Sequence, residues 1–252
     1  MSFEIDLSGR RALVTGAGQH TGRAFALGLA RAGAEVAVND IVAEKADAVV
    51  AAIVGAGGRA RAAIFDVTDH AAVTAGISEV APDIVVCNTG ATGAIELPFR
   101  PFTETEPDSW RPLVDVNLYG VANCVHAALP AMVEDGWGRL ITIVSDAARR
   151  GERGLAMYGA SKAAAAAFTR SMAVEYGPVG ITANSLSFST LRHDDTDAID
   201  PDIERRLLRN YSVNRLGTST DPVGIAVLLA SDHAAWITGQ VIPVDGGYTQ
   251  AL

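Results

Sequence analysis

The chain has 252 residues, of which 49% are hydrophobic, and a formal net charge of −9 at pH 7. This length and apolar content suffice for one sizeable core, so we expect residues 1–252 to form a single domain. No basic cluster interrupts the acidic charge, which argues against a nucleic-acid-binding protein. No uninterrupted run of about 18 apolar residues occurs, so we expect neither a membrane span nor a membrane partner.

The two cysteines, Cys87 and Cys124, lie in apolar stretches and indicate no disulfide framework, so we expect a cytoplasmic protein. Residues 1–9 lack the basic and apolar regions of a signal peptide. The five histidines show no spacing typical of metal ligands, and we therefore predict no metal site.

In chain order, the pattern predicts a strand over 11–15, a helix over 21–32, a strand over 35–39, a helix over 42–54, a strand over 60–65, a helix over 69–80 and a strand over 83–87. A long helix over about 105–134 follows, with Thr105 as its cap and Pro107 and Asp108 in its first turn. The remaining elements are a strand over 139–144, a helix over 157–176, a strand over 181–187, a helix over 221–230 and a strand over 240–244.

This alternation predicts an α/β fold with a mostly parallel sheet and helices on both of its faces. Only residues 188–219 interrupt it. This segment is polar and acidic and contains one short helical pattern at 202–210. Because it follows the carboxyl end of a strand, we expect residues 188–219 to form a substrate lid.

A glycine-rich stretch follows the first predicted strand, with Gly16, Gly18 and Gly22 in the sequence Thr15-Gly16-Ala17-Gly18-Gln19-His20-Thr21-Gly22. Glycines at a strand-to-helix turn let the backbone approach a diphosphate, which the helix N-terminus favours. Taken alone, the stretch also fits an ordinary glycine-rich turn.

Asp40 ends the second strand, where a carboxylate can accept hydrogen bonds from both hydroxyls of the adenosine ribose and repels a 2′-phosphate. No Arg or Lys occupies position 19 or directly follows Asp40, which favours NAD over NADP. The alternative is a solvated loop aspartate.

Tyr158 and Lys162 lie four residues apart in a predicted helix and therefore on one helix face, about 6 Å apart along the axis. A phenol has an ordinary pKa of about 10, and a nearby ammonium lowers it. Tyr158 can then exchange a proton with an alcohol or ketone while a hydride moves to or from a nicotinamide. The chain has only two lysines, Lys45 and Lys162, so a chance pairing is a weak alternative.

Two further polar residues suit this chemistry. Ser145 follows the fifth strand, where its hydroxyl can stabilise charge on a substrate oxygen. Asn117 lies within the long helix, where asparagine is unfavourable, and can bind a water that connects Lys162 to solvent. A turn serine and a buried amide remain the alternatives for these two residues.

Together these stretches resemble the short-chain dehydrogenase/reductase family over essentially the whole chain. The glycine-rich stretch, including Gln19, His20 and Thr21, stands at the family's Thr-Gly-x-x-x-Gly-x-Gly loop. Asp66 and Val67 stand at its adenine-contacting pair, and Asn88 and Gly90 belong to its Asn-Asn-Ala-Gly segment. Residues 237–247 resemble its C-terminal signature, and its catalytic tetrad is matched by Asn117, Ser145, Tyr158 and Lys162.

The resemblance implies a Rossmann-type doubly wound sheet of seven strands in the order 3-2-1-4-5-6-7. The expected cofactor is NAD, because of Asp40. The resemblance also implies that Tyr158 is the acid/base, that Lys162 also binds the ribose, and that Ser145 contacts the substrate oxygen. It further implies a homotetramer that pairs through the helices beginning near Thr105 and Met157.

The chain departs from the family pattern at three places. His20 replaces the second glycine of the phosphate loop, and we expect altered cofactor affinity rather than its loss. Cys87 and Thr89 alter the Asn-Asn-Ala-Gly segment. Phe188 and Ser189 replace a Pro-Gly pair beside the nicotinamide.

The stretch Ser145-Asp146-Ala147-Ala148-Arg149-Arg150 resembles family members that act on alicyclic hydroxyacyl-CoA thioesters. Arg149 and Arg150 can bind phosphates of a CoA carrier, with Phe188 also near the substrate, or they can form surface ion pairs. We expect an NAD(H)-dependent oxidoreductase that interconverts a secondary alcohol and a ketone in a small-molecule substrate. The alternatives are an NADP-dependent 3-oxoacyl thioester reductase and an NAD-binding regulator without catalysis.

Overall fold

A computed structural model of the chain describes residues 4–90, 99–193 and 200–250. Its main sheet has seven parallel strands in the order β3-β2-β1-β4-β5-β6-β9. The strands are β1 (Arg11–Val14), β2 (Glu35–Asp40), β3 (Arg59–Ile64), β4 (Ile84–Cys87), β5 (Gly138–Ser145), β6 (Ile181–Phe188) and β9 (Val241–Val244). The predicted α/β fold and its strand order are confirmed, with β9 as the seventh strand.

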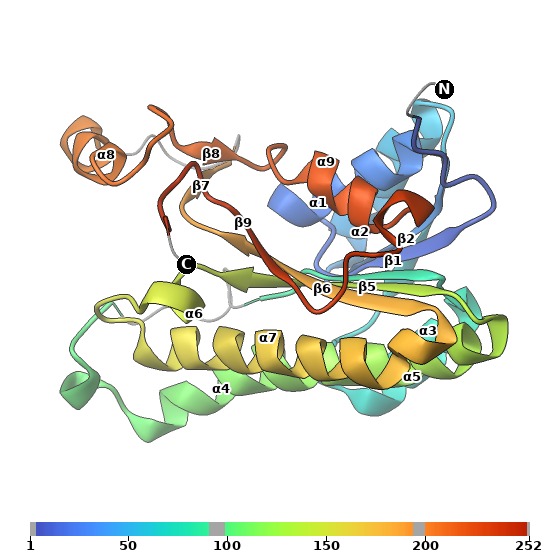
Figure 1. The fold of residues 1–252 in the computed structure, drawn as a ribbon, viewed down its shortest axis with the longest axis horizontal. Helices are drawn as coiled ribbons and strands as arrows, with labels where there is room; N and C mark the ends of the chain where they lie inside the picture. Colours follow the sequence, from blue (N-terminus) through green and yellow to red (C-terminus); the bar gives the residue numbers. More distant parts are fainter. Residues whose placement is uncertain (1–3, 91–98, 194–199, 251–252) are drawn as a thin grey trace.

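Helices cover both faces of this sheet, as Figure 1 shows. One face carries α1 (His20–Arg31), α2 (Ala43–Gly55) and α9 (Val223–Leu229). The other carries α3 (His70–Val80), α5 (Gly120–Asp135) and α7 (Ala156–Tyr176). Each layer has its own buried cluster, one around Phe25 and Leu29 and one around Val125 and Met132. Because both faces are buried, the central strands β1 and β4 are nearly continuous apolar runs.

The long predicted helix begins later than expected and is not uniform. Short turns η1 (Phe102–Glu104) and η2 (Pro107–Ser109) precede α4 (Trp110–Val114), the π-helical turn η3 (Asp115–Tyr119) and α5. The prediction that Thr105 caps this helix is wrong. Its hydroxyl donates to the carbonyl of Phe102 at 2.8 Å and accepts from Trp110 Nε1 at 2.9 Å, so it holds the preceding turn instead.

Among the described residues, Pro107–Asp135 is the one helical stretch long and apolar enough to cross a membrane by length and composition. Its apolar side chains include Val121, Val125 and Met132, which belong to the buried cluster beneath the sheet. Helix α5 contacts β4, β5 and α7, so packing in the core accounts for its composition.

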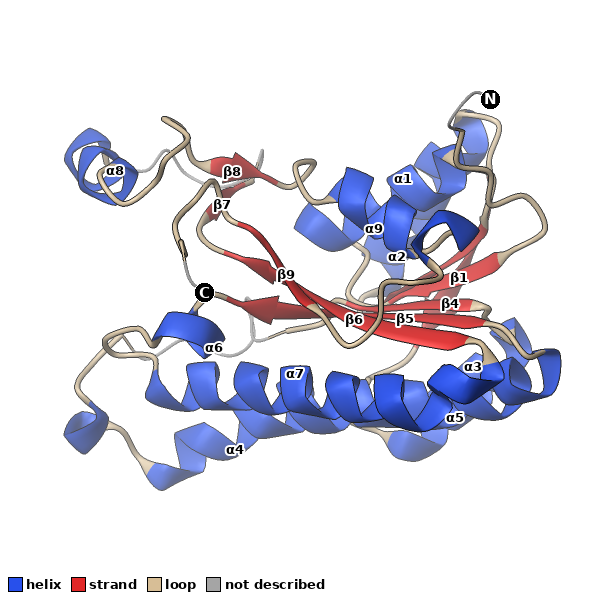
Figure 2. Ribbon diagram, in the orientation of Figure 1, coloured by secondary structure: helices blue, strands red, loops and turns tan. Residues whose placement is uncertain are grey.

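Residues 188–219 contain two short strands that the sequence did not predict, β7 (Leu191–Arg192) and β8 (Gly217–Thr218), which pair with each other. They also contain α8 (Pro201–Leu208), close to the helical pattern predicted at 202–210. Figure 2 shows these elements beyond the carboxyl ends of β5 and β6, where α6 (Ala147–Arg150) also lies. Part of the expected lid, residues 194–199, lies outside the described residues.

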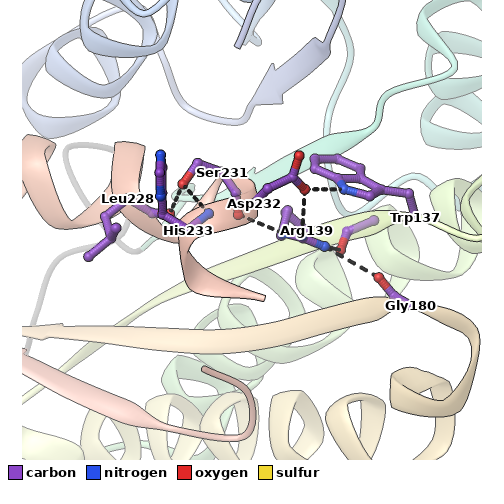
Figure 3. A network of polar contacts seen from close by, with 8 residues as sticks. Trp137, Arg139, Gly180, Leu228, Ser231, Asp232 and His233 are labelled. Atoms are coloured by element: carbon purple, nitrogen blue, oxygen red, sulfur yellow. Dashed lines mark hydrogen bonds and ion pairs between the residues drawn. The ribbon is translucent and has the colours of Figure 1, made fainter. Parts of the chain in front are cut away.

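A polar network ties the start of β5 to the chain before β9, as Figure 3 shows. The buried Arg139 donates to the carbonyl oxygens of Ser231 and Gly180 and pairs with Asp232 at 3.2 Å. Trp137 donates to the same Asp232 carboxylate at 2.8 Å, and its ring lies 4.2 Å from the Arg139 guanidinium. Burial lowers the pKa of Arg139, and these contacts offset the cost of burying its charge.

Candidate active site

A cavity of about 730 Å³ lies at the carboxyl ends of the central strands. Its volume falls within the range typical of small-molecule and cofactor sites. Most of the residues predicted for the site line this cavity: Gly16, Gln19, His20, Thr21, Gly22, Asp40, Asp66, Val67, Asn88, Gly90, Ser145, Tyr158, Lys162 and Phe188. Gly18, Asn117, Arg149 and Arg150 are not among its lining residues.

The glycine-rich loop connects β1 to α1 at one side of the cavity. A Cβ atom on Gly22 would lie 2.2 Å from the carbonyl oxygen of Gly16, so only glycine fits there. Gly16 itself has a φ of +59°, which glycine adopts without strain. The Asn88 side-chain amide donates to the carbonyls of Thr15 and Gly16 at 3.0 and 3.1 Å and holds the loop in place. This close packing places the N-terminus of α1 at the cavity, where it suits a diphosphate.

Asp40 ends β2 and lies beside the glycine-rich loop. Its carboxylate accepts hydrogen bonds from the backbone amides of Gly18 and Val42 at 3.1 and 3.0 Å. Asp40 is therefore held toward the cavity and is not a solvated loop residue. The two residues predicted to contact the adenine, Asp66 and Val67, differ in burial. Asp66 is exposed and accepts hydrogen bonds from Thr68, whereas Val67 is buried.

Lys45 is a functional candidate that the sequence argument missed. It lies on the first turns of α2, lines the same cavity as Asp40, and donates to Gln19 Oε1 at 2.6 Å. The positions adjacent to Asp40 in the sequence hold no cation, so no partner for a 2′-phosphate was expected. In the folded chain, α2 follows β2 and lies over the glycine-rich loop. The Lys45 ammonium therefore reaches the same end of the cavity as Asp40. The signal that could have found it is a lysine five residues after Asp40, at the start of the next predicted helix.

The catalytic candidates meet at the other end of the cavity. Ser145 ends β5, and Tyr158 and Lys162 lie one turn apart on α7, which packs against β5 and β6. Lys162 is buried, and its Nζ donates to the carbonyl oxygen of Ile143 at 2.9 Å. Burial lowers the pKa of Lys162 to about 8, because the ammonium loses its hydration.

The pKa of Tyr158 differs from the prediction. Burial raises this pKa, a hydrogen bond with Ser145 opposes that effect, and the charge of Glu152 raises it further. The expectation that Lys162 lowers the pKa of Tyr158 is therefore wrong in this structure, since Lys162 Nζ is directed to Ile143 instead. The group that favours the phenolate is the Ser145 hydroxyl.

Asn117 lies in the π-helical turn, a feature that frequently marks functional sites. Its Nδ2 donates to Ser161 Oγ at 2.9 Å, and Ser161 donates to the carbonyl of Tyr158 at 2.8 Å. Asn117 Oδ1 is buried without a hydrogen-bond partner among the described residues. A Cβ on Gly90 would lie 3.5 Å from this oxygen and 3.3 Å from Lys162 Nζ, so both groups face one spot. A buried acceptor of this kind requires a donor, which suits a bound water or ligand hydroxyl.

Arg149 and Arg150 contact the C-terminal segment instead of the cavity. Arg149 donates to Thr249 Oγ1 at 2.5 Å and lies 3.9 Å from the carboxylate of Asp146. The guanidinium of Arg150 lies 4.3 Å from the centre of the Tyr248 ring. These contacts favour the alternative in which both arginines pair with nearby residues of the chain. The binding of CoA phosphates stays a prediction.

Asp146 is a second residue that the sequence argument did not single out. It is buried directly after Ser145, and its carboxylate accepts a short hydrogen bond from Ser187. Burial raises the pKa of Asp146 to about 6, and the nearby charge of Asp245 adds to this. Its backbone amide also donates to the carbonyl of Phe188 at 3.0 Å, so Asp146 joins the ends of β5 and β6 beside the catalytic serine.

The cavity as a whole fits a nicotinamide dinucleotide. The glycine-rich loop leaves no room for a Cβ at Gly22, Asp40 is directed inward, and Asn117 presents an unpartnered buried oxygen near Lys162. Among the described residues, no group of three or more His, Cys, Asp or Glu side chains is arranged to hold a metal ion.

Comparisons with known proteins agree with this geometry. Residues 16–249 match the family model described as enoyl-(acyl carrier protein) reductase. The chain is 34% identical to 7alpha-hydroxysteroid dehydrogenase of Escherichia coli, with 100% of this chain and 98% of that protein aligned. It is 37% identical to a 3-oxoacyl-[acyl-carrier-protein] reductase of Staphylococcus aureus, over 94% of this chain and 97% of the relative.

Among solved structures, a gluconate 5-dehydrogenase from Burkholderia cenocepacia in complex with NADP and tartrate superposes with a TM-score of 0.91. It is 35% identical and covers 99% of this chain and 98% of its own. The sheet order matches what the sequence resemblance implied, and Ser145, Tyr158 and Lys162 line one cavity with the glycine-rich loop. The chain belongs to the short-chain dehydrogenase/reductase family of oxidoreductases.

Proposed function

We propose that this protein is an NAD(H)-dependent dehydrogenase that interconverts a secondary alcohol and a ketone. The single observation that carries the proposal is that Ser145, Tyr158 and Lys162 line the same cavity as the glycine-rich loop and Asp40. The residues proposed for proton transfer and those proposed for dinucleotide binding thus share one cavity. The bound cofactor supplies hydride transfer.

The side chains have separate tasks in this proposal. The Ser145 hydroxyl binds the substrate oxygen and favours the phenolate of Tyr158 through their hydrogen bond. Tyr158 accepts the alcohol proton in oxidation and returns it in reduction. Lys162 and Asn117 face the same spot beside Gly90, so they would hold a ribose hydroxyl of the cofactor or a water there.

NAD is the proposed cofactor because the Asp40 carboxylate lines the cavity at the end of β2, where its charge would repel a 2′-phosphate. Lys45 weakens this preference, since its ammonium can reach a 2′-phosphate at the same end of the cavity. The Burkholderia relative was crystallised with NADP, which also favours some acceptance of the phosphorylated cofactor.

The substrate is proposed only as a secondary alcohol or its ketone. Steroid and sugar-acid dehydrogenases are both among the relatives. A second candidate, reduction of a 3-oxoacyl thioester, is favoured by the 37% identity to the Staphylococcus reductase. The hydroxyacyl-CoA thioester rests on the sequence resemblance alone, because Arg149 and Arg150 already have partners. The lid, the homotetramer and the cytoplasmic location also stay predictions.

The test is a hydride-transfer assay that follows absorbance of the reduced cofactor, with a panel of hydroxysteroids, sugar acids and 3-oxoacyl thioesters. Turnover of at least one alcohol or ketone with NAD(H) supports the proposal, and a higher kcat/KM with NADPH would overturn the choice of cofactor. Dinucleotide binding without turnover of any substrate would favour the non-catalytic regulator.

A further inference from the structure

Two imidazole rings from distant segments stack on each other at the wall of the cavity. His20 is the first residue of α1, and His193 directly follows β7. Their ring centres lie 4.0 Å apart with an angle of 13° between the planes, and both residues line the cavity. The contact joins the glycine-rich loop to the segment after β6.

The backbone of His20 indicates that this contact is maintained against a conformational cost. His20 has a φ of +50°, and Ala81 is the only other non-glycine residue with a positive φ in the described part of the chain. An L-residue in this region is strained compared with glycine. A glycine would adopt this backbone conformation without strain, so the conformation of the loop does not by itself explain a histidine at position 20.

The partner ring is also fixed in place. His193 Nδ1 lies 2.8 Å from Ser219 Oγ, and Ser219 follows β8, the strand that pairs with β7. A second ring contact, between Phe25 on α1 and Phe188 at the end of β6, has centres 6.2 Å apart. The two ring contacts hold residues 188–193 against α1 and its preceding loop.

We propose that the stacked pair of His20 and His193 closes the cavity over the diphosphate of the bound dinucleotide and slows its release. This inference rests on the proposed function, which identifies the ligand. Helix N-termini bind diphosphates. His20 is the first residue of α1, and the N-terminus of α1 lies at the cavity. The pair therefore lies over the middle of the dinucleotide, away from Asp40 at one end and Tyr158 at the other.

The test measures the rate of NADH release by stopped-flow fluorescence for the wild type, His20→Gly, His193→Ala and the double variant. We expect each single variant to release NADH about 2- to 10-fold faster, the range given by an aromatic pair. The double variant should be no faster than the faster single variant, because either change removes the same contact. Equal rates in all four proteins, or fully multiplicative effects, would overturn the inference.

Two controls separate stacking from other effects. His20→Phe retains an aromatic ring, so it should keep a release rate close to wild type, and a rate as fast as that of His20→Gly would count against stacking. His70→Ala changes another close imidazole pair, His70 and His126, whose members do not line the cavity, and should leave release unchanged. His20→Gly relieves the positive φ, so its unfolding midpoint should not fall.

The outcomes also distinguish this inference from the proposed function. If the wild type neither binds NADH nor transfers a hydride, both fail. If the wild type binds NADH and turns over substrate while the variants release it at the wild-type rate, only the role of the histidine pair fails.

Discussion

Replacing Lys162 with methionine should stabilise the protein while removing its activity. Lys162 is buried, and its pKa falls from the ordinary 10.5 to about 8. At 1.36 kcal/mol per pH unit, burying the ammonium costs about 3 kcal/mol at pH 7. Methionine has a similar shape without the charge and loses only the hydrogen bond to Ile143, a loss of about 1 kcal/mol. The free energy of unfolding should therefore rise by about 2 kcal/mol at pH 7.

The sign of the pH dependence follows from the same shift. The unfolded chain keeps the Lys162 proton up to about pH 10.5, whereas the folded protein releases it near pH 8. The wild type therefore gains stability between these two values, and the advantage of Lys162→Met should disappear by about pH 10.

Urea unfolding at pH 7 and pH 10, without added dinucleotide, measures both effects. Lys45→Met is the matched control, because Lys45 is the other lysine of the chain and is exposed. It should change stability by less than about 0.5 kcal/mol. A Lys162→Met variant that is less stable than the wild type at pH 7 would refute the buried-charge reasoning.

The other predictions concern chemistry, cofactor choice and one carboxylate. Tyr158→Phe should reduce kcat by several orders of magnitude and leave NADH binding in a fluorescence titration largely intact; retained turnover would exclude Tyr158 as the acid/base. Asp40→Ala should lower the ratio of kcat/KM for NAD over NADP, and Lys45→Ala should raise it; an unchanged ratio in either variant would contradict the corresponding contact. The raised pKa of Asp146, about 6, means that its ionisation costs stability as pH rises from about 4 to above 6, by about 3 kcal/mol. Asp146→Asn should therefore gain stability relative to wild type over that interval in urea titrations, and parallel curves would exclude the shift.

The order of the sheet and the two ends of the cavity could be predicted because their signals are local. Apolar runs separated by helical patterns identify β1 to β6 and β9, and short parallel connections leave few possible arrangements. The glycines of the phosphate loop and the Tyr158–Lys162 spacing are likewise readable within a few residues. Each of these features depends on backbone conformation or on neighbours along one element.

Contacts between distant segments were decided only by tertiary packing. Lys45 reaches the Asp40 end of the cavity because α2 folds back over the loop, and Lys162 is directed to Ile143 because α7 packs on β5. The stacking of His20 on His193 joins residues more than 170 positions apart. Sequence periodicity specifies which face of an element is buried, but it does not specify which side chain of another element that face will meet. Burial and partners set pKa values and specificity, so those properties required the folded structure.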